Sequence, residues 1–138
     1  MRAVLDKVPQ QATTIVTCMD VRVDPLAALG FVPGDAHVLR NAGGVVTDDV
    51  VRSLIVSQRI LGTRRIVLIG HTDCGISGRP AVELSAELGR DLLTFTSVED
   101  AVRASIERLR AEPDVASDDV DGYVFDVDTG EVRGVDRR

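Results

Sequence analysis

Short apolar runs rich in β-branched residues alternate along the chain with segments whose apolar positions recur at helical spacing. The run 64–70 (RRIVLIG) is apolar at nearly every position, which is typical of a strand buried on both faces of a sheet. Segment 47–62 instead places its Val, Leu and Ile residues on one face of a helix. This pattern predicts strands within 13–22, 36–44, 64–70 and 121–135, and helices within 24–31, 47–62, 80–93 and 97–113. Strands that alternate with helices predict an α/β fold, in which helices flank a mostly parallel central β-sheet.

Length and composition indicate one folded unit. The chain has 138 residues, of which 44% are hydrophobic, enough for a single core. It contains no internal repeat, linker or low-complexity stretch, so we expect a single domain over residues 1–138. Because only 3% of the residues are aromatic, this core must be aliphatic.

Charge and hydropathy argue against some kinds of binding partner and favour one cellular location. The net charge of −6 repels phosphate backbones, which argues against nucleic acid as a partner. No stretch reaches the roughly 20 apolar residues that a membrane helix requires, so no membrane association is expected. The first residues, MRAVLDKVPQQATT, lack the apolar core of a secretion signal, which favours a cytoplasmic location.

Three residues that bind metals well fall at the ends of predicted strands. Cys18 closes the apolar run of the first strand, while His71 and Cys74 directly follow the run 64–70. The carboxyl ends of parallel strands meet at one edge of a sheet, so these side chains can converge. Two cysteines and one histidine leave the fourth position of a tetrahedral zinc ion open, as catalytic zinc sites require. The sequence therefore predicts a zinc site.

Other interpretations of these residues stay open. The chain has two cysteines, too few for a disulfide framework, and both could be buried apolar side chains. A redox dithiol is also conceivable, although it leaves His71 without a role and the spacing is not CxxC. We interpret His37, inside segment 36–44, as an ordinary polar residue. Glycines 70, 75 and 78 suit a tight loop around an ion.

An acidic and a basic residue stand close to Cys18. Asp20 and Arg22 follow it at two and four positions, where the first strand gives way to a loop. An arginine fork can hold a carboxylate through two parallel hydrogen bonds, which would fix Asp20 beside the metal. The alternative is a surface ion pair, which contributes little to stability.

Three short motifs resemble a known enzyme family. The stretches CMDVR (18–22), RNAGG (40–44) and HTDCG (71–75) resemble, in sequence and order, the signature motifs of the β-class carbonic anhydrases. The stretch GYVFDVDTGEV (122–132) resembles the strand pair that closes those proteins. The resemblance covers residues 13–75 closely and 97–135 loosely, while segment 76–96 is shorter than in many members.

The resemblance implies a reaction and a role for each motif. It implies that Cys18, His71 and Cys74 bind Zn²⁺ and that Asp20 and Arg22 form a catalytic dyad beside it. It places the substrate against the loop formed by Asn41, Ala42, Gly43 and Gly44. The implied activity is the reversible hydration of CO₂ to bicarbonate and a proton by zinc-bound hydroxide. Members of the family are typically homodimers or homotetramers.

The motifs leave three alternatives open. Relatives on the same scaffold hydrolyse carbon disulfide or carbonyl sulfide with the same ligands, so residues at the metal do not separate these substrates. A non-catalytic zinc-binding regulatory protein would retain the ligands as well. In some members the aspartate itself fills the fourth zinc position, and the sequence does not decide whether Asp20 does so here.

Overall fold

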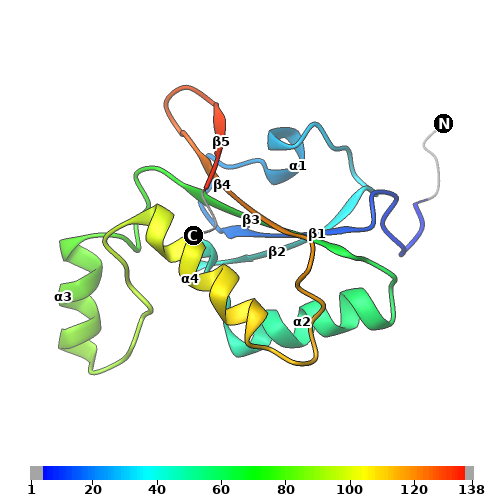
Figure 1. The fold of residues 1–138 in the computed structure, drawn as a ribbon. Coiled ribbons are helices and arrows are strands. Elements are labelled where there is room, and N and C mark those ends of the chain that lie inside the picture. The colour runs from blue at the N-terminus through cyan, green and yellow to red at the C-terminus, as the bar shows by residue number, and fades with distance from the viewer. Residues whose placement is uncertain (1–4, 136–138) are drawn as a thin grey trace.

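A five-stranded β-sheet in the order β2-β1-β3-β4-β5 forms the centre of the computed structural model, which describes residues 5–135 (Figure 1). The strands are β1 (Thr13–Cys18), β2 (Ala36–Asn41), β3 (Arg65–His71), β4 (Val120–Phe125) and β5 (Val132–Gly134). The helices are α1 (Pro25–Ala28), α2 (Asp48–Arg59), α3 (Arg79–Leu88) and α4 (Val98–Arg110), with a 3₁₀ turn η1 (Ala42–Gly44). The first four strands are parallel, and only β5 runs antiparallel to its neighbour β4. The predicted fold class is confirmed.

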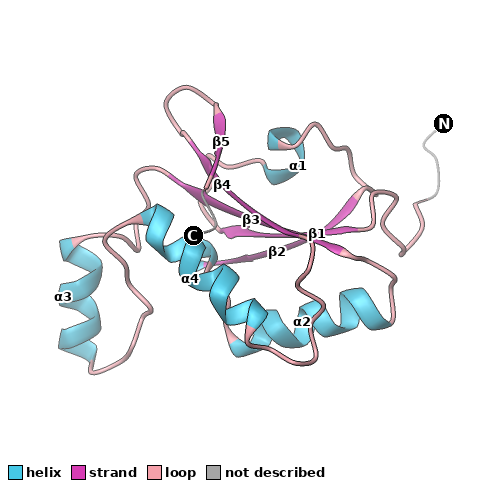
Figure 2. Cartoon of the chain, in the orientation of Figure 1, coloured by secondary structure: helices cyan, strands magenta, loops and turns pink. Residues whose placement is uncertain are grey.

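Helices cover both faces of the sheet (Figure 2). Helices α2 and α4 pack against one face through a large aliphatic cluster that includes Leu54, Ile106 and Leu109. On the other face, a smaller cluster centred on Ile15 and Ile69 packs against α1 and the residues that follow it. The central strands β1 and β3 are therefore buried on both sides, as their unbroken apolar runs predict.

The pairing of β1 with β3 brings together segments more than fifty residues apart. Their register places Thr17 beside Ile69, and the Thr17 hydroxyl donates a hydrogen bond to the Ile69 carbonyl oxygen over 2.8 Å. Cys18 and His71 close these two strands and therefore lie at the same edge of the sheet.

Two glycines allow α4 to lie close to the sheet. A Cβ atom on Gly70 would stand 2.6 Å from the Cγ2 atom of Val98, and one on Gly122 would stand 2.6 Å from Cγ1 of Val102. These distances are shorter than non-bonded carbon–carbon contacts in folded proteins, so a side chain at either position would force its neighbours to move. The interpretation of Gly70 as part of a loop around an ion is therefore wrong: it lies inside β3 and makes room for α4.

Helix α3 stands apart from the sheet (Figure 1). The helix expected within 80–93 spans 79–88 and ends where Gly89 adopts a left-handed conformation with φ of 61°. Ala81 is its one buried residue. No helix among residues 5–135 is long and apolar enough to span a membrane.

We expect the Gly122→Ala substitution to destabilise the fold by about 1–3 kcal/mol, since the added methyl group overpacks the contact with Val102. Adding Val102→Ala should relieve part of this strain, so the double variant loses less stability than the two single variants together. Chemical denaturation measures all three. Gly134→Ala is the control, because a Cβ atom there meets open space; equal losses in Gly122→Ala and Gly134→Ala would contradict the packing argument.

Candidate metal centre

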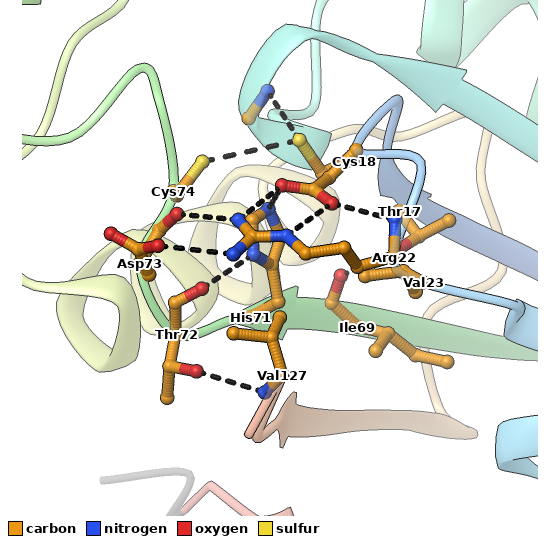
Figure 3. Close-up of polar contacts among 12 residues, drawn as sticks. Thr17, Cys18, Arg22, Val23, Ile69, His71, Thr72, Asp73, Cys74 and Val127 are labelled. Atoms are coloured by element: carbon orange, nitrogen blue, oxygen red, sulfur yellow. Dashed lines mark hydrogen bonds and ion pairs between the residues drawn. The ribbon is translucent and has the colours of Figure 1, made fainter. Parts of the chain in front are cut away.

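Three donor side chains converge at the carboxyl edge of the sheet (Figure 3). Cys18 ends β1, His71 ends β3, and Cys74 lies in the loop that follows β3. Their donor atoms all lie within 4.8 Å of one another, and the two Sγ atoms are 3.9 Å apart. All three residues are at least nine-tenths buried. The structure thus brings together the three residues that the sequence singled out.

The imidazole of His71 is oriented as a metal ligand. Its Nδ1 atom lies 2.7 Å from the carbonyl oxygen of Thr72, which can only accept a hydrogen bond, so Nδ1 carries the proton. The lone pair is therefore on Nε2, which is buried and has no hydrogen-bond partner in the described part of the chain. A buried polar atom without a partner is unfavourable, and a cation at the centre of the donor set would supply one.

The thiols favour a cation at the same point. Burial raises the pKa of the Cys74 thiol to about 11, and the neighbouring Cys18 contributes in the same direction. A cation between the two sulfur atoms stabilises their thiolate forms. The backbone N–H of Gly43 donates a hydrogen bond to Cys18 Sγ over 3.3 Å. Two thiolates and one imidazole nitrogen form a donor set that fits Zn²⁺.

The turn after β2 forms a floor of small residues beside Cys18. Gly43 and Gly44 have φ of 87° and 64°, and a Cβ atom on Gly44 would stand 2.9 Å from the backbone nitrogen of Cys18. Both positions therefore need glycine for conformation and for space. Asn41 closes the turn by donating from its amide to the Val45 carbonyl and accepting from the Val45 N–H. Ala42 is the first residue of this turn.

Asp20 and Arg22 form the bidentate pair that their spacing suggested. Arg22 donates from Nε to Asp20 Oδ1 over 3.0 Å and from Nη2 to Oδ2 over 2.7 Å, and its backbone N–H adds a third bond. These bonds hold the pKa of the Asp20 carboxyl well below its usual range, so it is ionised at neutral pH. Asp20 Oδ2 lies 3.8 Å from His71 Nε2, which places the carboxylate next to the donor set.

Two side chains in the motifs were not predicted to shape the site. Arg40 donates to the backbone carbonyls of Cys18, Asp20 and Val23 over 2.7–3.1 Å, so it fixes the loop after β1. Asp73 accepts a hydrogen bond from Arg22. Both residues lie inside the motifs RNAGG and HTDCG, and their place in these motifs was the one feature of the sequence that pointed to a role in the site. Their hydrogen-bond partners could not be predicted from the sequence, because every residue has a backbone carbonyl and the Asp73–Arg22 contact joins distant positions.

The remaining histidine lies elsewhere. His37 pairs with Thr14 near the opposite end of β2, and its Nδ1 atom forms a hydrogen bond of 2.7 Å with the hydroxyl of Ser57. It takes no part in the donor set.

One hollow is lined by two of the three donors, and a second reaches the end of the turn after β2 at Val45 without touching a donor. The first, of about 370 Å³, is bounded mostly by polar residues and by the two donors at and after the end of β3: His71, Thr72, Asp73, Cys74, Ser77, Thr96, Ser97, Val98 and Glu99. The other, of about 390 Å³, has mostly apolar walls that include Val45, Leu93 and Phe95. The Phe95 ring also lies against the floor, since a Cβ atom on Gly43 would stand 3.1 Å from its Cε1 atom.

Known proteins resemble the chain in both sequence and structure. A family model described as carbonic anhydrase matches residues 13–90. β-Carbonic anhydrase 1 of Mycobacterium tuberculosis is 44% identical over 137 residues, which cover 92% of this chain and 83% of that protein. A crystal structure of carbonic anhydrase from Streptococcus mutans matches with a TM-score of 0.89 and 44% identity, over 99% of this chain and 88% of that one. A carbon disulfide hydrolase of Saccharolobus solfataricus is 55% identical over 62 residues, which cover 45% of this chain and 30% of that protein.

Replacing a donor residue should abolish zinc binding, whereas replacing His37 should not. We expect His71→Ala and Cys74→Ser to be purified with far less than one zinc per chain, because each removes one of three protein ligands. His37→Ala is the matched control and should retain its zinc, since His37 is the other of the two histidines and lies away from the donors. Elemental analysis of the purified proteins measures this. Full zinc occupancy in His71→Ala would exclude the proposed donor set.

Proposed function

Because the chain belongs to the β-class carbonic anhydrase family, we propose that it is a zinc lyase that catalyses the reversible hydration of CO₂ to bicarbonate and a proton. Zinc is the cofactor of this family, and we assign its protein ligands to Cys18, His71 and Cys74. The observation that carries the proposal is the position of an ionised carboxylate, Asp20, beside this buried donor set. A site with a purely structural metal has no need of such a group.

The chain's own charges explain why the site needs Asp20. When bound, Zn²⁺ is a Lewis acid that lowers the pKa of a coordinated water, to about 7 in the three-histidine site of other carbonic anhydrases. The thiolates of Cys18 and Cys74 cancel the formal charge of the cation, so they weaken this effect. The hydrogen bond from the Gly43 N–H withdraws some electron density from Cys18 Sγ and partly offsets it.

Asp20 orients the attacking water, which the metal donors do not contact. Because Arg22 keeps it ionised, its carboxylate can only accept hydrogen bonds. It therefore accepts one from the water that adds to the carbon of CO₂ and directs a lone pair of that water at the substrate. The floor from Asn41 to Gly44 is closely packed, since a Cβ atom on Gly43 would stand 2.6 Å from Ile76 Cγ2, so we place the substrate beside this floor, in the hollow that His71 and Cys74 line. The polar hollow beside His71 offers solvent a route for the proton.

A second candidate is hydrolysis of carbon disulfide or carbonyl sulfide. The local identity to a carbon disulfide hydrolase favours it, because 62 residues match at 55%. The similarity to carbonic anhydrases extends over 92% of the chain, and for this reason we place CO₂ first. A zinc-binding regulatory protein without activity is a third candidate, and the bidentate Asp20–Arg22 pair beside the donors argues against it.

Assembly and location complete the proposal. We propose a homodimer or homotetramer, as is typical of the family. The edge strand β2 supports this, since one side of its backbone is unpaired by the sheet and a hollow of about 270 Å³ lies beside it, between Val38 and Val56 of α2. We propose a cytoplasmic location, where reducing conditions keep both cysteines available to the metal.

The activity is tested by stopped-flow hydration of CO₂ on zinc-loaded protein at alkaline pH. We expect turnover in the parent and a loss of about 10- to 100-fold in Asp20→Ala, the range found when groups that orient a metal site are removed. Arg22→Gln should lose activity in the same direction, because Asp20 is then no longer held. The controls are Asp49→Asn and Arg52→Gln, which break an exposed ion pair on α2 and should retain parental rates.

The same preparation separates the candidates. Zinc content is measured beside each rate, so a lost metal is not mistaken for a lost catalytic group. Turnover of carbon disulfide or carbonyl sulfide without turnover of CO₂ would replace the first candidate by the second. A fully zinc-loaded protein that turns over none of the three substrates would overturn both.

The assembly is tested by light scattering coupled to size-exclusion chromatography. We expect the mass of two or four chains at micromolar concentration. The mass of one chain under these conditions would contradict the proposed oligomer without bearing on the metal site.

A further inference from the structure

The guanidinium of Arg22 is shared between two aspartates. One edge holds Asp20 through Nε and Nη2, as described above. The other edge faces Asp73: Nη1 donates to its carboxylate Oδ2 over 3.0 Å, and Nη2 donates to its backbone carbonyl over 2.9 Å (Figure 3). Because the five N–H groups of arginine form a rigid planar fork, a partner on one edge also fixes the direction of the other edge.

Asp73 reaches Arg22 from an unusual backbone conformation. Its φ is 53°, in the left-handed region that aspartate and asparagine tolerate better than most residues. It stands between His71 and Cys74, yet it is not one of the three converging donors. Its side chain is 81% exposed, so burial does not account for its position.

The contact joins the two loops that follow the donor-bearing strands β1 and β3. Arg22 lies on the loop that follows Cys18, the last residue of β1, and Asp73 lies on the loop after β3, which includes Cys74. The hydrogen bonds between Arg22 and Asp73 therefore tie these loops together across 51 positions of sequence.

We propose that Asp73 is a positioning residue, which fixes the plane of the Arg22 guanidinium so that its other edge holds Asp20 beside the metal donors. This inference rests on the proposed function of the site. It assigns Asp73 no contact with substrate or metal, because its effect passes through Arg22. The competing interpretation is an exposed ion pair without consequence, which is the usual outcome for pairs of this exposure.

The left-handed backbone decides which variants test the proposal. Asp73→Asn keeps an acceptor and a residue that tolerates positive φ, and removes only the charge. Asp73→Gly removes the side chain without adding backbone strain, whereas alanine would add such strain and confuse the result. Asp128→Asn and Asp128→Gly are the matched controls, because Asp128 is an exposed aspartate in the turn between β4 and β5.

We expect three effects in the zinc-loaded protein. The kcat for CO₂ hydration falls about 2- to 5-fold in Asp73→Asn and further in Asp73→Gly, with KM unchanged, a size typical of an exposed charged pair. Release of Zn²⁺ to a chromophoric chelator becomes faster by a similar factor, because the two loops are less firmly joined. The NMR signal of the Arg22 Nε–H group exchanges faster with water. The Asp128 variants behave like the parent in all three measurements.

The decisive test compares the effect of Asp73→Asn in the parent with its effect in a chain that already carries Arg22→Gln. If Asp73 acts through Arg22, Asp73→Asn has no further effect on zinc release once Arg22 is replaced. An equal effect in both backgrounds, or parental zinc release and Arg22 exchange in both Asp73 variants, would overturn the proposal. If the parent does not hydrate CO₂, the proposed function fails, while zinc release and the Arg22 signal still test the role of Asp73.

Discussion

The parallel pairing of β1 with β3 is the constraint on which the site depends. The register that sets Thr17 beside Ile69 places the ends of both strands at one edge, so Cys18 reaches His71 and Cys74 without a long loop. This pairing is stabilised by the burial of both strands between helices, in clusters of apolar side chains that reach Ile69, two residues before His71. The packing of aliphatic residues in the core therefore sets the positions of the three candidate donors, whose side chains supply the atoms that can bind a metal.

Hydrogen bonds to the backbone refine that geometry around the donors. Thr72 fixes the tautomer of His71, Gly43 donates to the sulfur of Cys18, and Arg40 binds three carbonyls of the loop after β1. None of these partners is itself a donor to the metal, yet each limits where a donor can point. The ionised Asp20 is the one acidic group that this arrangement leaves within 4 Å of His71 Nε2 among the described residues. A buried Nε2 atom without a partner and a carboxylate held ionised nearby are complementary to a cation with a water molecule attached.

The residues at the metal do not by themselves choose among CO₂, carbon disulfide and carbonyl sulfide, which are all linear triatomic molecules. Discrimination must come from the walls, where the polar hollow beside His71 and the mostly apolar hollow lined by Phe95 differ in character. Both hollows are bounded in part by residues from the segment between β3 and α4.

The alternation of strands and helices, the residue types of the candidate metal donors and the resemblance to the family could all be predicted from the order of residues alone. Hydrophobic periodicity reports the burial of each position, and His71, Cys74 and Cys18 carry their chemistry in their side chains. Contacts with neighbours distant in the chain could not be predicted in this way: Gly70 makes room for α4 and does not wrap an ion, Arg40 binds backbone carbonyls, and Asp73 shares Arg22 with Asp20. The type of a residue limits what its side chain can bind, but the packing of strands and loops sets which groups lie close enough to be bound.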